Sequence, residues 1–171
     1  LLTSQIAALA PAEIAGLTVS ALAGLTTDQI VGLDTDHFVS LTSIQISTLT
    51  SAQIGALTTT QLAALTNDQA RVLTATQMPA IASGNLAFIS IDNIPILSTL
   101  AVSALTTDQI GALTSDQFGS FVTQQVASLT GDQIQALTTN QTISVTPEQI
   151  GALSANQISN LTTSVLQSLA P

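Results

Sequence analysis

The residues most able to do chemistry in this sequence surround its only histidine, His37. Two acidic residues, Asp34 and Asp36, stand within three positions of it. A histidine beside carboxylates can serve as a general base or as one ligand of a metal ion. A catalytic triad also needs a nucleophile, and a zinc site needs several ligands, and the sequence around His37 offers neither set. We therefore interpret His37 as a substitute for glutamine at the start of a helix.

The aspartates form a second set that could do chemistry, because many of them recur at one place in a repeat. Calcium requires several oxygen atoms that converge on one point, whereas one acid in each repeat is too sparse. We interpret these acids as first-turn residues that offset the positive end of a helix dipole, and we expect no metal site. The row comprises Asp28, Asp36, Asp68, Asp92, Asp108, Asp116 and Asp132.

Composition excludes several classes of partner and activity. Among 171 residues the net charge is −9, and Arg71 is the only lysine or arginine. Such a surface repels nucleic acids and anionic membranes. No apolar run approaches the roughly 18 residues of a membrane-spanning helix, and without cysteine there is no thiolate nucleophile or ligand. We expect no enzyme activity, no cofactor, no nucleic-acid partner and no membrane insertion.

An eight-residue repeat, here called the octad, runs through the chain from Leu1 without insertion or deletion. Position 1 is always large and apolar, position 6 is nearly always so, position 2 is mostly Thr or Ser, and position 5 is mostly Gln. The octad of residues 105–112 is typical. Thr106 can cap a helix, and Gln109 can return to the N–H of the cap, which completes a capping box. The sequence predicts this box at Thr26 and Gln29, Thr106 and Gln109, Thr114 and Gln117, and Thr130 and Gln133.

Three architectures compete for this period. A single long helix is rejected, because eight residues advance it by about 80° beyond two turns and the leucines would wind around its surface. A β-solenoid stays as an alternative, since Thr and Gln ladders suit stacked strands. We favour an all-α solenoid of very short capped helices, with Pro11 and Pro147 at first helical positions. Two octads per turn would be the smallest arrangement. The predicted core spine includes Leu25, Ile30, Leu105, Ile110, Leu113, Leu129 and Ile134.

We expect residues 1–171 to form one continuous domain whose repeat weakens around residues 78–104. Apolar residues there occupy places that are polar elsewhere, which suggests lateral burial against a second copy. The N-terminus lacks Met and the basic start of a signal peptide, so we expect a mature or excised segment. The residues expected to mediate self-association are Ile89, Ile91, Ile94 and Ile96.

The motifs Leu-Thr-Thr-Asp-Gln-Ile, Leu-Thr-Ser-Ala-Gln-Ile and Leu-Thr-Thr-Thr-Gln-Leu resemble the Thr/Gln/Ala repeats of very large secreted bacterial surface proteins, among them adhesins, haemagglutinins and haem-utilisation proteins. The resemblance implies an extracellular or cell-surface location and a structural role as a filament, adhesin stalk or biofilm fibre. A homo-oligomer or filament, and a host or matrix surface, are the expected partners. Two alternatives are a module that binds ice, glycan or mineral through its Thr/Gln face, and a haem-binding surface protein, for which Met78 and His37 are the conceivable ligands.

Overall fold

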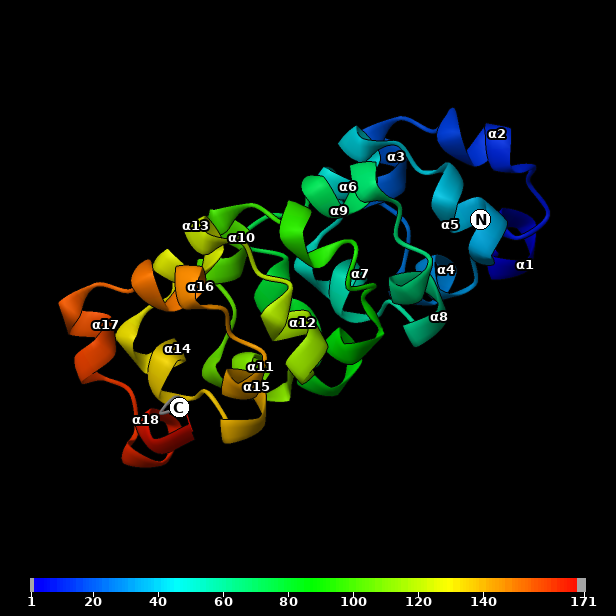
Figure 1. Ribbon diagram of the computed structural model, residues 1–171. Helices are drawn as coiled ribbons and strands as arrows, with labels where there is room; N and C mark the ends of the chain where they lie inside the picture. The colour runs from blue at the N-terminus through cyan, green and yellow to red at the C-terminus, as the bar shows by residue number, and fades with distance from the viewer. Residues whose placement is uncertain (1, 169–171) are drawn as a thin grey trace.

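The computed structural model describes residues 2–168 and is helical from end to end. Its short helices wind into an elongated solenoid whose two ends are the two ends of the chain (Figure 1). The all-α solenoid is thus confirmed. The β-solenoid alternative is wrong, because residues 2–168 contain no strand. Within the same range, no helix is long and apolar enough to span a membrane.

Outside residues 73–96, each octad of the described chain starts a new α-helix because its second residue has an extended backbone and its third begins the helix. In the octad of residues 105–112, Thr106 has φ −72° and ψ 162°, and its hydroxyl accepts the N–H of Gln109. Pro11 and Pro147 each stand at the first position of their helices, as expected, where a missing N–H leaves no hydrogen bond unmade. Helices this short are unstable alone, so their stability depends on packing against neighbours.

Three octads make one turn of the solenoid, since nearly every helix contacts the helix three octads further along. This differs from the two octads that the sequence allowed as a minimum. The helices therefore stack in three columns. The first column contains α1 (Thr3–Ile6), α4 (Thr27–Val31), α7 (Ser51–Gly55), η1 (Met78–Ala80), α10 (Thr99–Ser103), α13 (Thr123–Ala127) and α16 (Pro147–Gly151). The second contains α2 (Pro11–Ala15), α5 (Thr35–Ser40), α8 (Thr59–Ala63), η2 (Ser83–Phe88), α11 (Thr107–Ala112), α14 (Gly131–Gln135) and α17 (Ala155–Ser159). The third contains α3 (Val19–Ala23), α6 (Ser43–Thr48), α9 (Asn67–Arg71), η3 (Ile94–Ile96), α12 (Ser115–Gly119), α15 (Thr139–Ile143) and α18 (Thr163–Ser168).

A continuous aliphatic core fills the centre between the columns. Positions 1 and 6 of nearly every octad point into it, so one core runs through all the turns. Of the predicted spine residues, Ile30, Ile110 and Ile134 are completely buried. Leu105, Leu113 and Leu129 are buried, and Leu25 packs against the core while partly buried. Burial of these side chains is the main term that stabilises the solenoid.

Small residues at positions 7 and 8 let successive turns approach each other closely. A Cβ atom built on Gly119 would lie 2.9 Å from Ser144 Cβ and 3.0 Å from Ser144 O, in the next turn. A Cβ atom on Gly55 would lie 2.9 Å from Ala80 O in the same way. Gly151 occupies the same octad position as both, but a Cβ there would meet nothing within 4 Å.

This difference predicts opposite effects for one substitution at two equivalent positions. Gly119→Ala should lower the free energy of unfolding by about 1–3 kcal/mol, because the new methyl group presses on the backbone of the next turn. Gly151→Ala should raise it by about 0.4–1 kcal/mol, because it restricts the unfolded chain without a clash. Urea unfolding followed by circular dichroism measures both changes. Equal changes in the two variants would contradict the tight contact at Gly119.

Residues 73–96 depart from the regular pattern, and they overlap the range 78–104 in which the sequence repeat weakens. Three consecutive octads there contain the 3-10 helices η1, η2 and η3 in place of α-helices. The self-association surface predicted in this region needs correction. Ile89 and Ile94 are buried in the core and Ile96 is half-buried, so only Ile91, at 50% exposure, offers a largely exposed side chain. Ile89 and Ile94 occupy positions 1 and 6, the two core positions of the octad.

Candidate functional site

The feature that most of the turns share is a row of position-5 glutamines, twelve of which make hydrogen bonds at both ends of their side-chain amides. The first end closes the capping box of its own helix. Thr26 N donates to Gln29 Oε1 at 2.8 Å, and Gln29 N donates to Thr26 Oγ1 at 3.3 Å. The same pair of bonds joins Thr106 to Gln109, Thr114 to Gln117, and Thr130 to Gln133, with distances between 2.8 and 3.2 Å.

The second end of the amide reaches the preceding turn of the solenoid. Gln61 Nε2 donates to Ile30 O at 2.8 Å and to Leu33 O at 2.9 Å. Both carbonyls lie at the end of a helix of the preceding turn, where backbone acceptors lack a full set of helical partners. Ile30 O also accepts Leu33 N at 3.2 Å, whereas Leu33 O accepts no backbone N–H of the described residues. We call this set of contacts the glutamine ladder. Its members are Gln45, Gln53, Gln61, Gln69, Gln77, Gln109, Gln117, Gln125, Gln133, Gln141, Gln149 and Gln157.

The ladder provides most of the hydrogen bonding between turns. The backbone–backbone bonds of the turns and caps in residues 2–168 join residues three or four apart, so they stay within one turn. A few hydroxyls add bonds from one turn to the next, such as Ser51 Oγ to Thr76 O at 3.1 Å. Each ladder glutamine is buried, and a buried amide or carbonyl without a partner costs about 1–3 kcal/mol. The ladder therefore fixes how one turn stacks on the next.

Sequence reasoning assigned these glutamines to capping and missed their contact with the preceding turn. One signal could have revealed it. A capping box accepts Glu as well as Gln, and the helix dipole favours Glu. Glu nevertheless stands at position 5 only once, at Glu13, in the first turn of the described chain. The strong preference for Gln indicates that the side chain must donate as well as accept.

His37 takes the place of a ladder glutamine. Its Nε2 lies 2.7 Å from Leu9 O in the preceding turn, and its backbone N–H donates to Asp34 Oδ1 at 3.0 Å. The ring Nδ1 lies 2.7 Å from the same Asp34 oxygen, at an angle unfavourable for a hydrogen bond. The structure thus gives His37 the position expected from the sequence, as a substitute for glutamine, with Asp34 as the helix cap.

A low pH should lower the stability of the solenoid by protonating two of its carboxylates, those of Asp34 and Glu148. The N–H of His37 lowers the pKa of Asp34 below its ordinary value of 3.8, and the His37 ring adds to the shift. The N–H of Glu148 itself, and then the Thr146 hydroxyl, lower the pKa of Glu148 in the same direction. A lowered pKa in the folded state means that the ionised form stabilises the fold. This stabilisation is present above about pH 4 and is lost as the pH falls through the folded-state value.

We therefore expect the melting temperature to fall between about pH 4 and pH 2, and to fall less in Asp34→Thr. Threonine at this place keeps the helix cap used by most other octads but carries no charge. Thermal unfolding at several pH values measures the difference between the two proteins. A wild-type curve that parallels that of Asp34→Thr would show that the Asp34 carboxylate does not contribute.

The ladder is interrupted in the middle of the chain. Position 5 holds Asn85, Asn93 and Ala101 in three consecutive octads. Asn93 Nδ2 donates to Leu65 O at 2.7 Å, but its Oδ1 is buried without a hydrogen-bond partner. Asparagine is one methylene shorter than glutamine, so its amide cannot span both the cap and the preceding turn. We call these three positions the ladder gap.

The described residues contain an open surface hollow and a small internal cavity. The hollow has a volume of about 400 Å³ and is bordered by Thr107, Asp132, Gln135 and Ala136. The apolar cavity, bordered by Phe118, Thr142 and Leu161, has a volume of about 20 Å³, which is far too small for haem. No group of three or more His, Cys, Asp or Glu residues within residues 2–168 is arranged to hold a metal ion.

The Thr face expected for ice or mineral binding is also affected by the capping geometry. Most position-2 hydroxyls, such as those of Thr58 and Thr114, accept the N–H of position 5 and so serve their own helices. The outward position 3 of the first column begins with Thr3, Thr27 and Ser51 and then reaches Ala75. The hydroxyl array on this face is therefore broken.

Comparison with protein families finds a repeat family that matches part of the chain. A family model described as the ALTTAQ repeat matches residues 30–67 and 94–123, less than half of the chain. No curated protein matches the sequence. The first matched segment ends before the ladder gap, the second includes Ala101 of the gap, and both contain Leu-Thr-x-x-Gln octads. These segments are similar to ALTTAQ repeats, and together with the stacked octads they identify the chain as a structural repeat protein.

Proposed function

We propose that this chain is a stiff structural segment of an extracellular bacterial filament, adhesin stalk or biofilm matrix fibre, without catalytic activity of its own. The single observation that carries the proposal is the glutamine ladder. A side chain that caps its own helix and also bonds the turn below couples each octad to its neighbours around and along the axis. Repetition of this contact along a continuous core favours a rod over a compact body.

The surface suits a role outside the cell that depends on length. It offers few charges to a specific partner, since only 6% of residues are charged. Arg71 provides the one site for trypsin-like proteases, an advantage among secreted proteases. The resemblance of the octads to repeats of large secreted bacterial surface proteins supports the same location.

Self-association is the interaction that we propose for this rod. Phe88, Ile91 and Leu100, in the middle of the chain, are at least 50% exposed, and Ile44 before them and Ile143 after them are exposed as well. Apolar side chains on an outer surface favour contact with a second copy or with a matrix surface. The negative charge of the chain makes nucleic acids and anionic membranes poor partners.

Negative-stain electron microscopy of the purified chain at increasing concentration tests the proposal. We expect uniform thin fibres or laterally aligned rods. A variant with Phe88→Ser and Ile91→Ser, which leaves the core and the ladder intact, should form fewer of them. Dispersed single particles at every concentration in both proteins would overturn the filament role.

A further inference from the structure

The ladder gap encircles the solenoid once. Asn85, Asn93 and Ala101 belong to three consecutive octads, and three octads make one complete turn. The missing contacts therefore lie on all three columns at the same level of the rod. A gap of this kind removes hydrogen bonds across one whole cross-section of the rod. The loss of the same number of bonds at scattered places would leave every cross-section partly bonded.

Few hydrogen bonds cross this level. In a regular turn each glutamine gives two bonds to the turn below, as Gln53 does to Leu22 O at 3.0 Å and Leu25 O at 2.8 Å. At the gap, the bond from Asn93 to Leu65 O is the one side-chain hydrogen bond within residues 2–168 that joins residues 82–104 to the turn below. Ala101 has no polar side chain, and the Asn85 side chain makes no hydrogen bond to any other residue that the structure describes.

The turn above the gap is held firmly from its other side. Gln117 donates to Leu86 O and Ile89 O, and Gln125 donates to Ile94 O and Leu97 O, each at 2.8 to 2.9 Å. Residues 82–104 are therefore bonded more firmly to the C-terminal part of the rod than to the N-terminal part. The weak level lies between them and residues 54–73.

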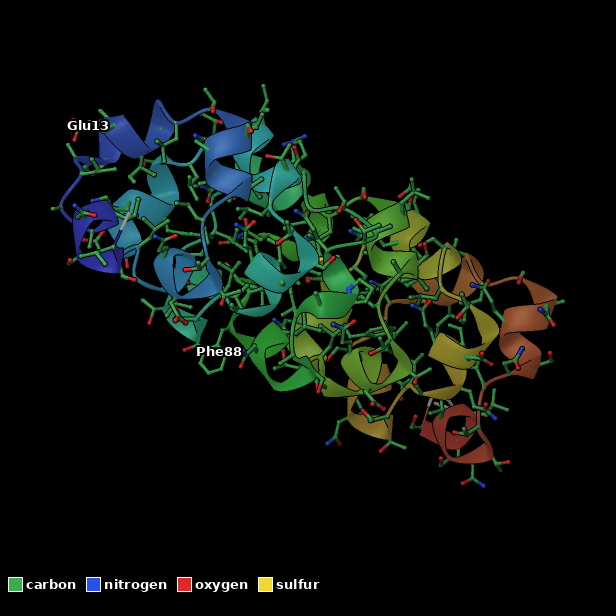
Figure 2. The ribbon with its side chains drawn as sticks, turned by 180° about the vertical axis from the view of Figure 1, so that it is seen from behind. Glu13 and Phe88 are labelled. Carbon is green, nitrogen blue, oxygen red and sulfur yellow. The ribbon has the colours of Figure 1, made fainter. Side chains whose placement is uncertain are left out.

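Two further features mark the same level. The helices η1, η2 and η3 have 3-10 geometry, whose hydrogen bonds are poorer than those of an α-helix. Phe88 projects outward from this part of the ribbon (Figure 2). The core itself stays closed, because Leu86, Ile94 and Val102 are at most 1% exposed. The closed solenoid is thus the ground state. An opening here breaks apolar contacts but only one side-chain hydrogen bond, from Asn93 to Leu65 O.

We propose that the ladder gap is a built-in opening point, at which residues 82–104 separate from residues 54–73 while the segments on either side stay folded. The chain then behaves as two stiff rods joined by a hinge. A rod with such a point yields under load at one defined place. The inference concerns the isolated chain and does not depend on the filament role.

Hydrogen exchange with mass spectrometry tests this opening on the complete chain. Short helices at an opened level lose the packing that keeps their hydrogen bonds closed, so their amides exchange. Amides of α8, α9, η2 and η3 should exchange at least about tenfold faster than those of α11 and α14. In Asn85→Gln/Asn93→Gln, which restores two ladder residues, their exchange should slow by about tenfold or more.

A matched variant moves the gap to another level. Gln61→Asn/Gln69→Asn shortens two consecutive ladder residues, and its fast exchange should extend to α4, α5 and α6, which lie at the new gap. Exchange at residues 54–104 as slow as in α11, or exchange unchanged in Asn85→Gln/Asn93→Gln, would overturn the proposal. If the matched variant fails to fold, the repaired variant still decides the question.

Discussion

Gln53→Glu should destabilise the solenoid by about 3–5 kcal/mol at neutral pH. The carboxylate can still accept the Thr50 N–H, which now meets Oε1 at 2.9 Å. It cannot donate, and it would face the carbonyl oxygens of Leu22 and Leu25 where the amide N–H groups of Gln53 now stand. The Leu25 carbonyl would lose its donor, whereas the Leu22 carbonyl would keep the N–H of Leu25 at 3.1 Å. A buried charge without a compensating partner is among the costliest single changes in a fold.

A matched substitution separates this effect from capping. Gln5→Glu introduces the same carboxylate in an exposed residue whose Oε1 accepts Leu2 N at 2.7 Å. Its effect should stay within about 0.5 kcal/mol. Urea unfolding of both variants at pH 7 gives the comparison. Burial raises the pKa of the carboxyl group introduced by Gln53→Glu, so the group becomes protonated and regains one donor as the pH is lowered, and the loss should shrink. Similar losses in the two variants would refute a donor role for the ladder.

Phe118→Ala should cost about 3–5 kcal/mol, the usual range for removing a buried ring. Phe118 is 1% exposed and fills a core position of α12 that is aliphatic in most other octads. Its ring also lies 5.1 Å from the ring of Phe121, at a tilted angle that favours aromatic pairs. The stiff backbone of stacked turns limits collapse around the new cavity, so little of the loss should be recovered.

Two comparisons isolate the packing term at Phe118. Phe118→Leu introduces the side chain already found at this position in Leu22, Leu62 and Leu86, and should cost less than about 1.5 kcal/mol. Phe88→Ala removes a half-exposed ring and should cost about 0.5 kcal/mol. Chemical denaturation ranks the three variants. If Phe118→Ala lowered the free energy of unfolding no more than Phe88→Ala does, burial of the Phe118 ring would not contribute to stability.

Local structure could be predicted from the sequence because each octad contains its own start signal. The Thr and Gln of a capping box fix where a helix begins, and position 1 with the preceding position 6 fixes its buried face. Ile89 and Ile94 follow this rule. Their assignment to an outer surface overlooked the octad positions that they occupy, whereas Ile91, at position 3, is exposed.

The number of octads per turn could not be predicted, because it depends on the angle between successive helices. That angle is set by the bend at position 1 and by the contact between turns, as at Gly119 and Ser144, which involve residues 25 apart in the chain. The second role of the glutamines follows from the same geometry. Until three octads per turn are known, the acceptors 28 and 31 residues before Gln61 have no reason to lie beside its amide.

The glutamine ladder recognises backbone carbonyls, and this has a consequence for how such chains lengthen. Gln77 donates to Ile46 O and Leu49 O, and any residue at those places would present the same carbonyls. Octads are therefore interchangeable as acceptors. Duplication or loss of whole eight-residue units during replication would leave each remaining glutamine with an equivalent partner. Genes of this type can thus change the length of the encoded rod without further mutations to restore the contacts between turns.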